Sequence, residues 1–305
     1  MKLSFFAFVL FLLPCCTMAQ KPVGLLGFLM DYPNARDFAL SADGKEAYLT
    51  LQNLNEDVAV IVRTRRVGKI WSKPVLTSFS GTFRDIEPFL SSDGLRLYFS
   101  SDRPLSDTAT TPKDYDIWYV ERKALKSDWG KPVNLGPPVN TPFNEFYPSL
   151  ARNGNLYFTS DWESTTGKDD IFFSAWNDGY TSPVPLPATV NSEGFEFNAF
   201  IAPDESFILY TGYNRKEGLG SGDLYISYKN PDGTWAPSKN LGPEINSKWM
   251  DYCPFVDAIG STLYFTSRRS AVQSRPFADI KSFKQEVTQY ENGLSRIYRV
   301  PFRKG

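Results

Sequence analysis

The sequence contains no histidine. This absence excludes Ser-His-Asp and Cys-His activation of a nucleophile, proton transfer by imidazole, and most zinc and copper sites. Cysteine is scarce too, because only Cys253 lies beyond the first 16 positions. We therefore expect no internal disulfide in a chain that has lost its N-terminal segment, and we predict that Cys253 is a buried, inert thiol.

Neither sign of charge is in excess. The 305 residues carry 33 Lys and Arg against 34 Asp and Glu, a formal net charge of −1. This balance provides no general attraction to nucleic acid or anionic lipid, so we expect no nucleic-acid partner. The one long apolar run, from Leu3 to Leu13, is too short to span a bilayer, and we expect no transmembrane segment.

That apolar run belongs to an N-terminal segment with the layout of an export signal. Thr17-Met18-Ala19 gives a small-x-small ending suited to cleavage before Gln20, which predicts a signal peptide over residues 1–19. Lipid attachment at Cys16 is the alternative, although Pro14 and Cys15 stand where such sites usually have small residues. Either route predicts a periplasmic or secreted protein.

Beyond the signal, five segments repeat one pattern. Each has an apolar strand, a tight turn such as Asp93-Gly94, and a second strand that ends in a hydroxyl residue. These hydroxyl residues are 50 to 59 positions apart: Thr50, Ser100, Thr159, Thr211 and Thr266. A third strand follows, and the fourth is marked by Trp-x-x-Pro at Trp71, Trp129 and Trp235, tryptophans that we expect to pack between repeats. Four strands per repeat predict the blades of an all-β propeller.

The ends of the chain predict how the ring closes. The fifth repeat has no room for a fourth strand, whereas Lys21-Pro-Val-Gly-Leu-Leu-Gly copies Lys131-Pro-Val-Asn-Leu-Gly and precedes the first repeat. We predict that the segment 21–30 completes the last blade and leaves no open sheet edge there. The mature chain is then one domain, 20–305, with five blades at about 36–81, 82–141, 142–193, 194–247 and 248–303.

The pattern Leu-Ser-x-Asp-Gly-x-x-Leu-Tyr-Phe-Ser-Ser-Asp-Arg, best developed within residues 90–120, resembles the periplasmic TolB-type, WD-like propeller repeat. The resemblance covers nearly the whole mature chain. It implies the fold but no single function, because such repeats serve scaffolds, receptors and parts of enzymes. Neither the α/β domain of TolB nor an OmpA-like domain is recognisable, so a role in the Tol–Pal system does not carry over.

One insertion interrupts the fifth repeat. Apolar residues recur at helical spacing between Pro276 and Tyr290, and Asn292-Gly293 suits a helix exit. We predict one amphipathic helix over 276–290 that rests its apolar face on the ring.

Acidic residues recur at the start of the first strand in four repeats. Asp85, Glu145, Glu196 and Asp251 are equivalent, with Ala35 in the first repeat, and Asp37 and Glu87 lie two residues further along. Equivalent positions of a ring approach its axis, so we predict a ring of carboxylates at the mouth of a central channel. The face carrying the inter-blade loops then also presents Arg103, Trp162, Tyr213, Arg215, Arg268 and Arg269.

These acids have two interpretations. They could form a polar, aromatic-edged site for a sugar, a peptide end or a cation such as calcium, although no Asp-x-Asp-x-Asp-Gly loop is present. Alternatively, they could only accept hydrogen bonds from inter-blade turns or pair with arginines, because a feature found in most blades usually serves the architecture.

Three functions are consistent with these features of the sequence. The first is a monomeric recognition or scaffold protein without a cofactor, which binds a protein, peptide or glycan through Asp85, Glu87, Glu145, Glu196, Asp251, Arg103, Trp162, Tyr213 and Arg268. The alternative is a glycoside hydrolase that uses Asp85, Glu145, Glu196 and Asp251, since two-carboxylate chemistry needs no histidine. A docking role of the helix in an envelope complex is a third.

Overall fold

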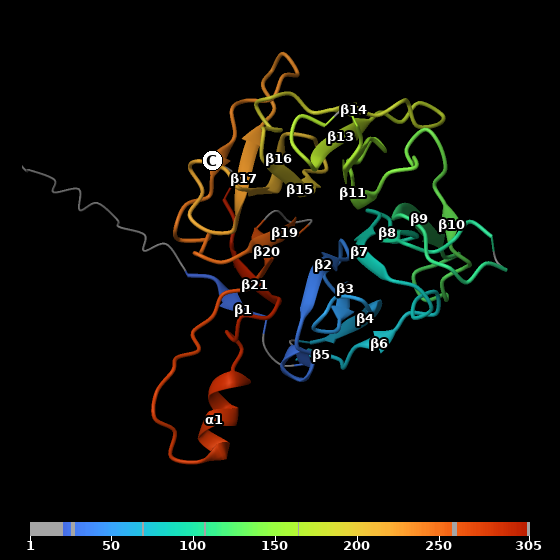
Figure 1. Cartoon of the computed structure of the whole chain (residues 1–305). Helices are drawn as coiled ribbons and strands as arrows, with labels where there is room; N and C mark the ends of the chain where they lie inside the picture. The colour runs from blue at the N-terminus through green and yellow to red at the C-terminus, as the bar shows by residue number, and fades with distance from the viewer. Residues whose placement is uncertain are drawn as a thin grey trace, which may run out of the picture.

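The computed structural model describes residues 21–25, 28–68, 70–106, 108–163, 165–257 and 261–303. They form five antiparallel sheets arranged around a central axis (Figure 1). The prediction of an all-β, five-bladed propeller is confirmed. Residues 1–19, to which the signal peptide and the Cys16 lipid site were assigned, lie outside the described part of the chain.

Each blade runs outward from an innermost strand at the axis to a short outer strand. Blade one contains β2 (Ala35–Leu40), β3 (Glu46–Gln52), β4 (Ala59–Val67), β5 (Ile70–Trp71) and β6 (Val75–Leu76). Blade two contains β7 (Asp85–Leu90), β8 (Arg96–Ser101), β9 (Asp116–Glu121) and β10 (Val133–Asn134), and blade three contains β11 (Glu145–Leu150), β12 (Leu156–Ser160), β13 (Asp170–Ser174) and β14 (Val184–Pro185). Blade four contains β15 (Phe195–Ile201), β16 (Phe207–Tyr213), β17 (Gly222–Tyr228) and β18 (Lys239–Asn240).

Blade five joins the two ends of the chain. Its strands are β19 (Asp251–Val256), β20 (Thr262–Ser267), β21 (Arg296–Pro301) and the N-terminal β1 (Val23–Gly24). Val23 pairs with Arg299 and Gly24 with Tyr298, and the Leu25 amide donates to the Ile297 carbonyl at 2.8 Å. The predicted closure by the N-terminal strand is confirmed. A short 3-10 helix, η1 (Phe28–Asp31), then leads into blade one.

The hydroxyl residues that mark the repeat fasten each blade to the next. The side-chain oxygen of Thr50 accepts from the Glu87 amide at 3.1 Å, and that of Thr159 accepts from the Asn198 amide at 3.1 Å. Ser100 and Thr266 do the same for Tyr147 and Asp37. In blade four the Thr211 hydroxyl makes no hydrogen bond. The repeated hydroxyl thus satisfies a buried backbone donor of the neighbouring innermost strand.

Aromatic side chains fill the spaces between blades. Trp129 of blade two meets Tyr48 of blade one edge to face, and its indole N–H donates to the Tyr48 hydroxyl at 3.1 Å. Trp235 of blade four packs on Tyr157 of blade three. The prediction that these tryptophans pack between blades is confirmed for this pair.

The helical insertion stands away from the ring. The helix α1 (Ile280–Val287) is shorter than predicted and begins at Asp279, whose carboxylate accepts from the Ser282 amide at 2.7 Å. None of its residues is buried, and Figure 1 shows it projecting outward from blade five. The predicted packing of its apolar face on the ring is wrong. Tyr290, beyond the helix, makes that contact instead, through hydrogen bonds to the Leu25 and Ile297 carbonyls.

Candidate functional site

Three of the acids that begin the innermost strands pair with an arginine of the same blade. Glu196 accepts from Arg215 at 2.8 Å and from the Ser192 hydroxyl at 2.7 Å. Asp251 accepts from Arg269 at 2.8 Å and from the Ser247 hydroxyl at 2.7 Å, and Asp85 pairs with Arg103 and Ser101. All three side chains are fully buried. These contacts are those of the architectural interpretation.

The paired arginines also lie against aromatic rings of their blades. The guanidinium carbon of Arg215 lies 4.6 Å from the ring centroid of Tyr225. That of Arg269 lies 4.6 Å from the ring centroid of Tyr298. Arg103 lies over Trp118 at 5.5 Å. Each arginine therefore contacts both a carboxylate and an aromatic ring at the loop end of its blade.

Blade three departs from this arrangement. Trp162 stands at the position of Arg103 and packs on Phe172 at 5.6 Å, so Glu145 has no arginine. The Glu145 carboxyl accepts from the Thr141 hydroxyl and amide at 2.5 and 3.2 Å and is fully buried. Burial raises its pKa to about 8, and the negative charges of Asp116 and Asp114 add to that rise. A pKa in this range favours the protonated form of Glu145 at neutral pH.

A second set of residues lies two positions further along each innermost strand. Each has a positive φ, between 50° and 61°, at a point where the strand register shifts: Asp37, Glu87, Tyr147, Asn198 and Cys253. This left-handed conformation is uncommon outside glycine, and it recurs here in all five blades. The side chains of this set contact one another across blades, which the four acids do not do in the contacts described.

Arg36 bonds to two carboxyl groups of this set. We call Arg36 and the set, namely Asp37, Glu87, Tyr147, Asn198 and Cys253, the axial cluster. Arg36 donates to Asp37 and to Glu87, each at 2.7 Å, and Glu87 also accepts from the Asn198 amide group at 3.1 Å. Burial raises the pKa of Glu87 to about 7, while Arg36 opposes that rise. The two carboxyl side chains are only 1% and 4% exposed, and the buried Cys253 thiol has a pKa well above its usual value. The prediction of a buried thiol is confirmed.

Two further residues of the predicted site lie on the loop face. Tyr213 is exposed and meets Phe195 edge to face at 5.4 Å. Arg268 pairs with Glu56 and lies over the Tyr252 ring at 5.8 Å. No group of three or more metal-ligating side chains occurs in the described ranges. Nor does any helix within them have the length and apolar character needed to cross a membrane.

A cavity opens on the opposite face, where the Asp-Gly hairpins lie. Its volume is about 220 Å³, and all five innermost strands contribute apolar side chains to it: Leu40, Phe89, Leu150, Phe200 and Phe255. Residues of four hairpin turns, Asp93 and Arg152 among them, also stand in its lining. We call this cavity the axial pocket. An apolar hollow with a few polar groups is the common form of a binding site.

The axial pocket and the axial cluster are separate. Between them lies a cavity of about 10 Å³ that is lined by Glu87 and Tyr147 and by Phe89, Phe200 and Phe255, three residues shared with the pocket. This volume is about the least that holds one water molecule. The phenyl rings therefore separate the pocket from the buried charges.

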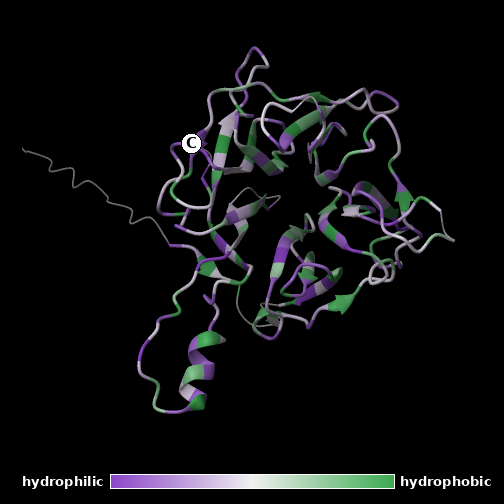
Figure 2. Cartoon of the chain, in the orientation of Figure 1, coloured by the Kyte–Doolittle hydropathy of each residue, from purple (hydrophilic) through white to green (hydrophobic). Residues whose placement is uncertain are grey.

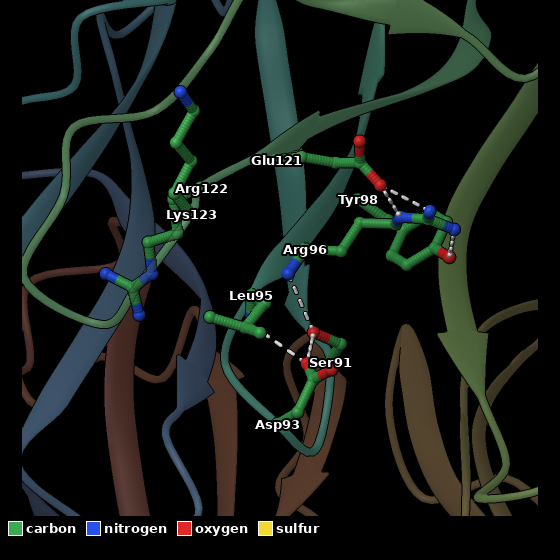
Figure 3. A pocket seen from close by; sticks show the side chains of 8 residues that line it. All are labelled: Ser91, Asp93, Leu95, Arg96, Tyr98, Glu121, Arg122 and Lys123. Carbon is green, nitrogen blue, oxygen red and sulfur yellow. Dashed lines mark hydrogen bonds and ion pairs between the residues drawn. The ribbon is translucent and has the colours of Figure 1, made fainter.

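A larger hollow, of about 770 Å³, lies on blade two (Figure 3). Most of its charged side chains already have partners, because Arg96 donates to Glu121 at 2.9 Å and Arg122 donates to Glu46 at 2.7 Å. The Ser91 and Asp93 side chains bond to one another within the hairpin turn. The hollow thus offers few unpaired polar groups to a ligand.

Sequence reasoning missed three of these features. Tyr147, Asn198 and Cys253 are the equivalents of Asp37 and Glu87, and extending the strand alignment by two residues would have grouped them. The exchange of arginine for Trp162 is likewise visible three residues after each strand-two hydroxyl in blades two, three and five. The axial pocket had no sequence signal, since its apolar residues look like ordinary core.

No protein-family model and no curated protein sequence matches the chain. Solved structures match its fold. A putative TolB from Agrobacterium tumefaciens is 14% identical, with a TM-score of 0.52 over 89% of this chain and 91% of that one. TolB from Acinetobacter baumannii, also 14% identical, matches at 0.50, and the match covers 90% of this chain and 55% of that one. The chain has the TolB-type propeller fold.

Glycoside hydrolases share the same architecture. The α-L-arabinofuranosidase PaAbf62A from Podospora anserina is 9% identical, with a TM-score of 0.57 over 93% of this chain and 95% of that one. An endo-arabinase from Bacteroides thetaiotaomicron is 13% identical, with a TM-score of 0.55 over 94% and 98%. At such identities the likeness concerns the fold alone.

Proposed function

We propose that this chain is an exported binding protein that accepts one apolar side chain of a protein or peptide partner in the axial pocket. The observation that carries the proposal is the convergence of five innermost strands on one apolar hollow. Its volume of about 220 Å³ lies below the roughly 300–1,000 Å³ of clefts that enclose a whole small ligand. A single aromatic or aliphatic anchor, which is how many protein interfaces concentrate their affinity, suits it better.

The axial pocket lies on the hairpin face, whereas the sequence predicted binding on the loop face. The sequence favoured the loop face because four acids recur there, but three of them are bonded to arginine and serine, and the raised pKa of Glu145 favours its protonated form. Binding of a protein, peptide or glycan by the loop face stays a prediction. The hairpin face is the first candidate, because a ligand can enter its mainly apolar pocket without breaking any of the ion pairs of the loop face.

A library of short random peptides tests the proposal. We expect selected peptides to share one large apolar residue. Ala42 is an exposed turn residue at the pocket, so Ala42→Trp should cover the opening and weaken peptide binding at least about tenfold, a loss of about 1.4 kcal/mol. Leu125→Trp, at an exposed position outside the pocket, is the matched control. Equal binding by the Ala42→Trp variant would refute the pocket as the site.

A glycoside hydrolase is the second candidate, favoured by the propeller architecture shared with the arabinofuranosidase and the endo-arabinase. Arg36 bridges the carboxyl groups of Asp37 and Glu87 at the axis. Catalysis would require Arg36 to move, because neither carboxyl group is accessible to a substrate. Release of sugar from arabinan or arabinoxylan, abolished in Glu87→Gln, would establish it over the binding protein.

A further inference from the structure

In blade one the turn after the third strand is flanked by two paired strands, whereas only isolated bridges stand there in blades three and four. The third strand of blade one, β4, has nine residues, compared with five to seven in β9, β13, β17 and β21. After Gly68 the chain turns back into β5, where Ile70 pairs with Val67 and Trp71 pairs with Arg66. The hairpin is held to the ring by Trp71, which packs edge to face on Phe38 at 6.3 Å. We call β4 from Arg63 onward, together with β5, the blade-one hairpin.

The tip of this hairpin presents two bare aliphatic side chains. Val67 is 77% exposed and Ile70 is 75% exposed, and they lie side by side as a cross-strand pair. Thr64, on the other side of β4, is buried, and its hydroxyl donates to the Ser72 carbonyl at 2.7 Å, which ties the two strands of the hairpin together. Figure 2 shows the short strands of blade one coloured as hydrophobic at the outer rim of the ring.

Positive charge surrounds these aliphatic residues. Residues 58–83 contain no Asp or Glu, although the whole chain has a net charge of −1, and their described cationic residues are Arg63, Arg65, Arg66 and Lys73. The Arg66 guanidinium donates to the Gly68 carbonyl at 3.1 Å, which places a cation at the turn itself. Arg65 and Val67 are two residues apart, so their side chains lie on the same side of β4.

Among the described residues, one carboxylate forms the ion pairs of the arginines at the base of the hairpin. Glu46 lies 3.3 Å from Arg65, 3.8 Å from Arg63 and 2.7 Å from Arg122 of blade two. One negative charge therefore faces three guanidinium groups. The surface keeps an excess of positive charge next to the exposed Val67 and Ile70.

We propose that the blade-one hairpin binds the surface of an anionic lipid bilayer, with Val67 and Ile70 inserted among the lipid headgroups. Cations that attract lipid phosphates, next to aliphatic groups that enter the interface, are the two features such binding requires. A bilayer needs no complementary shape, which suits a projecting tip rather than a groove. The near-zero net charge of the whole chain gives no sign of this site, because the excess of positive charge is confined to one hairpin.

Sedimentation with phosphatidylcholine vesicles, with and without phosphatidylglycerol, tests the proposal. We expect the protein to sediment with the anionic vesicles and to be released by salt. Val67→Thr with Ile70→Thr keeps the β-branched shape but removes apolar area, and should weaken binding at least about tenfold. Arg65→Gln with Arg66→Gln should weaken it by a similar factor. Val133→Thr with Val184→Thr, at exposed outer-strand positions of blades two and three, is the matched control and should bind as the unchanged protein does.

Three outcomes would overturn this assignment. They are no binding to anionic vesicles, equal binding to neutral ones, and full binding by the Val67→Thr/Ile70→Thr variant. The last of these, together with binding to a soluble polyanion, would mark a purely electrostatic surface for an acidic macromolecule. Ala42→Trp should leave vesicle binding unchanged, so this test stands apart from that of the axial pocket.

Discussion

Arg36 of blade one donates to Glu87 of blade two at 2.7 Å, across the boundary between the first two blades. The same guanidinium group holds Asp37, so one cation compensates two buried carboxyl groups. Removal of one member of such a cluster leaves a charge in a place that water cannot reach.

Arg36→Met should therefore destabilise the protein strongly. Breaking a buried ion pair from one side typically costs about 3–5 kcal/mol of unfolding free energy. Denaturant unfolding of the purified protein measures this cost. Arg96→Met, which breaks the exposed pair with Glu121, is the matched control and should cost about 1 kcal/mol or less. Equal losses in the two variants would contradict a special role of the axial cluster.

Glu145 should make stability fall as pH rises. Its folded pKa of about 8 lies above the ordinary value of about 4.3, so the folded state binds more protons across that window. Its stabilising effect is complete below the ordinary pKa and is lost as pH rises through about 8. Within the window the loss approaches about 1.4 kcal/mol per pH unit, and Glu145→Gln should flatten it. Thermal unfolding at a series of pH values measures both slopes.

Glu196→Gln is the control for that series, because it leaves Arg215 buried without its carboxylate and should lower stability at neutral pH. Unchanged pH dependence in Glu145→Gln would show that another group causes it.

Trp162→Arg should restore in blade three the arrangement of its neighbours. An arginine at this position would stabilise the ionised form of Glu145 and bring its pKa down, as an adjacent cation does. The pH-dependent loss of stability should then shrink without removal of the acid. Carboxyl titration followed by NMR on the labelled protein gives the pKa directly, and an unchanged value would contradict the pairing.

Thr159→Val should cost about 1–3 kcal/mol, because the buried Asn198 amide loses its acceptor. Thr211→Val removes a hydroxyl of the equivalent position that makes no hydrogen bond, so it should be neutral or slightly stabilising. Both variants keep the side-chain shape. Comparing their denaturation midpoints isolates the bond between blades, and equal effects would contradict its contribution.

Closure of the ring should depend on Leu29 in η1. This fully buried side chain packs with Tyr264 and Ile297 of blade five and with Leu49 of blade one. Leu29→Ala should cost about 2–5 kcal/mol, while Met30→Ala at the exposed neighbour should cost little. Calorimetric unfolding tests the difference. A small effect of Leu29→Ala would show that the pairing of β1 with β21, rather than the packing of Leu29, stabilises the closure of the ring.

The sequence by itself determined the number of blades and the closing strand. Repeated hydroxyls such as Ser100, turns such as Asp93-Gly94 and the copied Lys21-Pro-Val motif are local signals, and each reports a strand or turn within a few residues of itself. Packing of Trp129 and Trp235 between blades followed from the same periodicity.

Only the tertiary structure decided which charges meet, where a pocket opens and whether the helix packs. Arg36 and Glu87 are 51 residues apart, and Glu145 lacks an arginine only because Trp162 occupies that place. The helix at 280–287 has a pattern typical of packing, yet none of its residues is buried. Periodicity specifies which residues share a face, whereas pairing, burial and pKa depend on distances that arise when blades from distant parts of the chain come together.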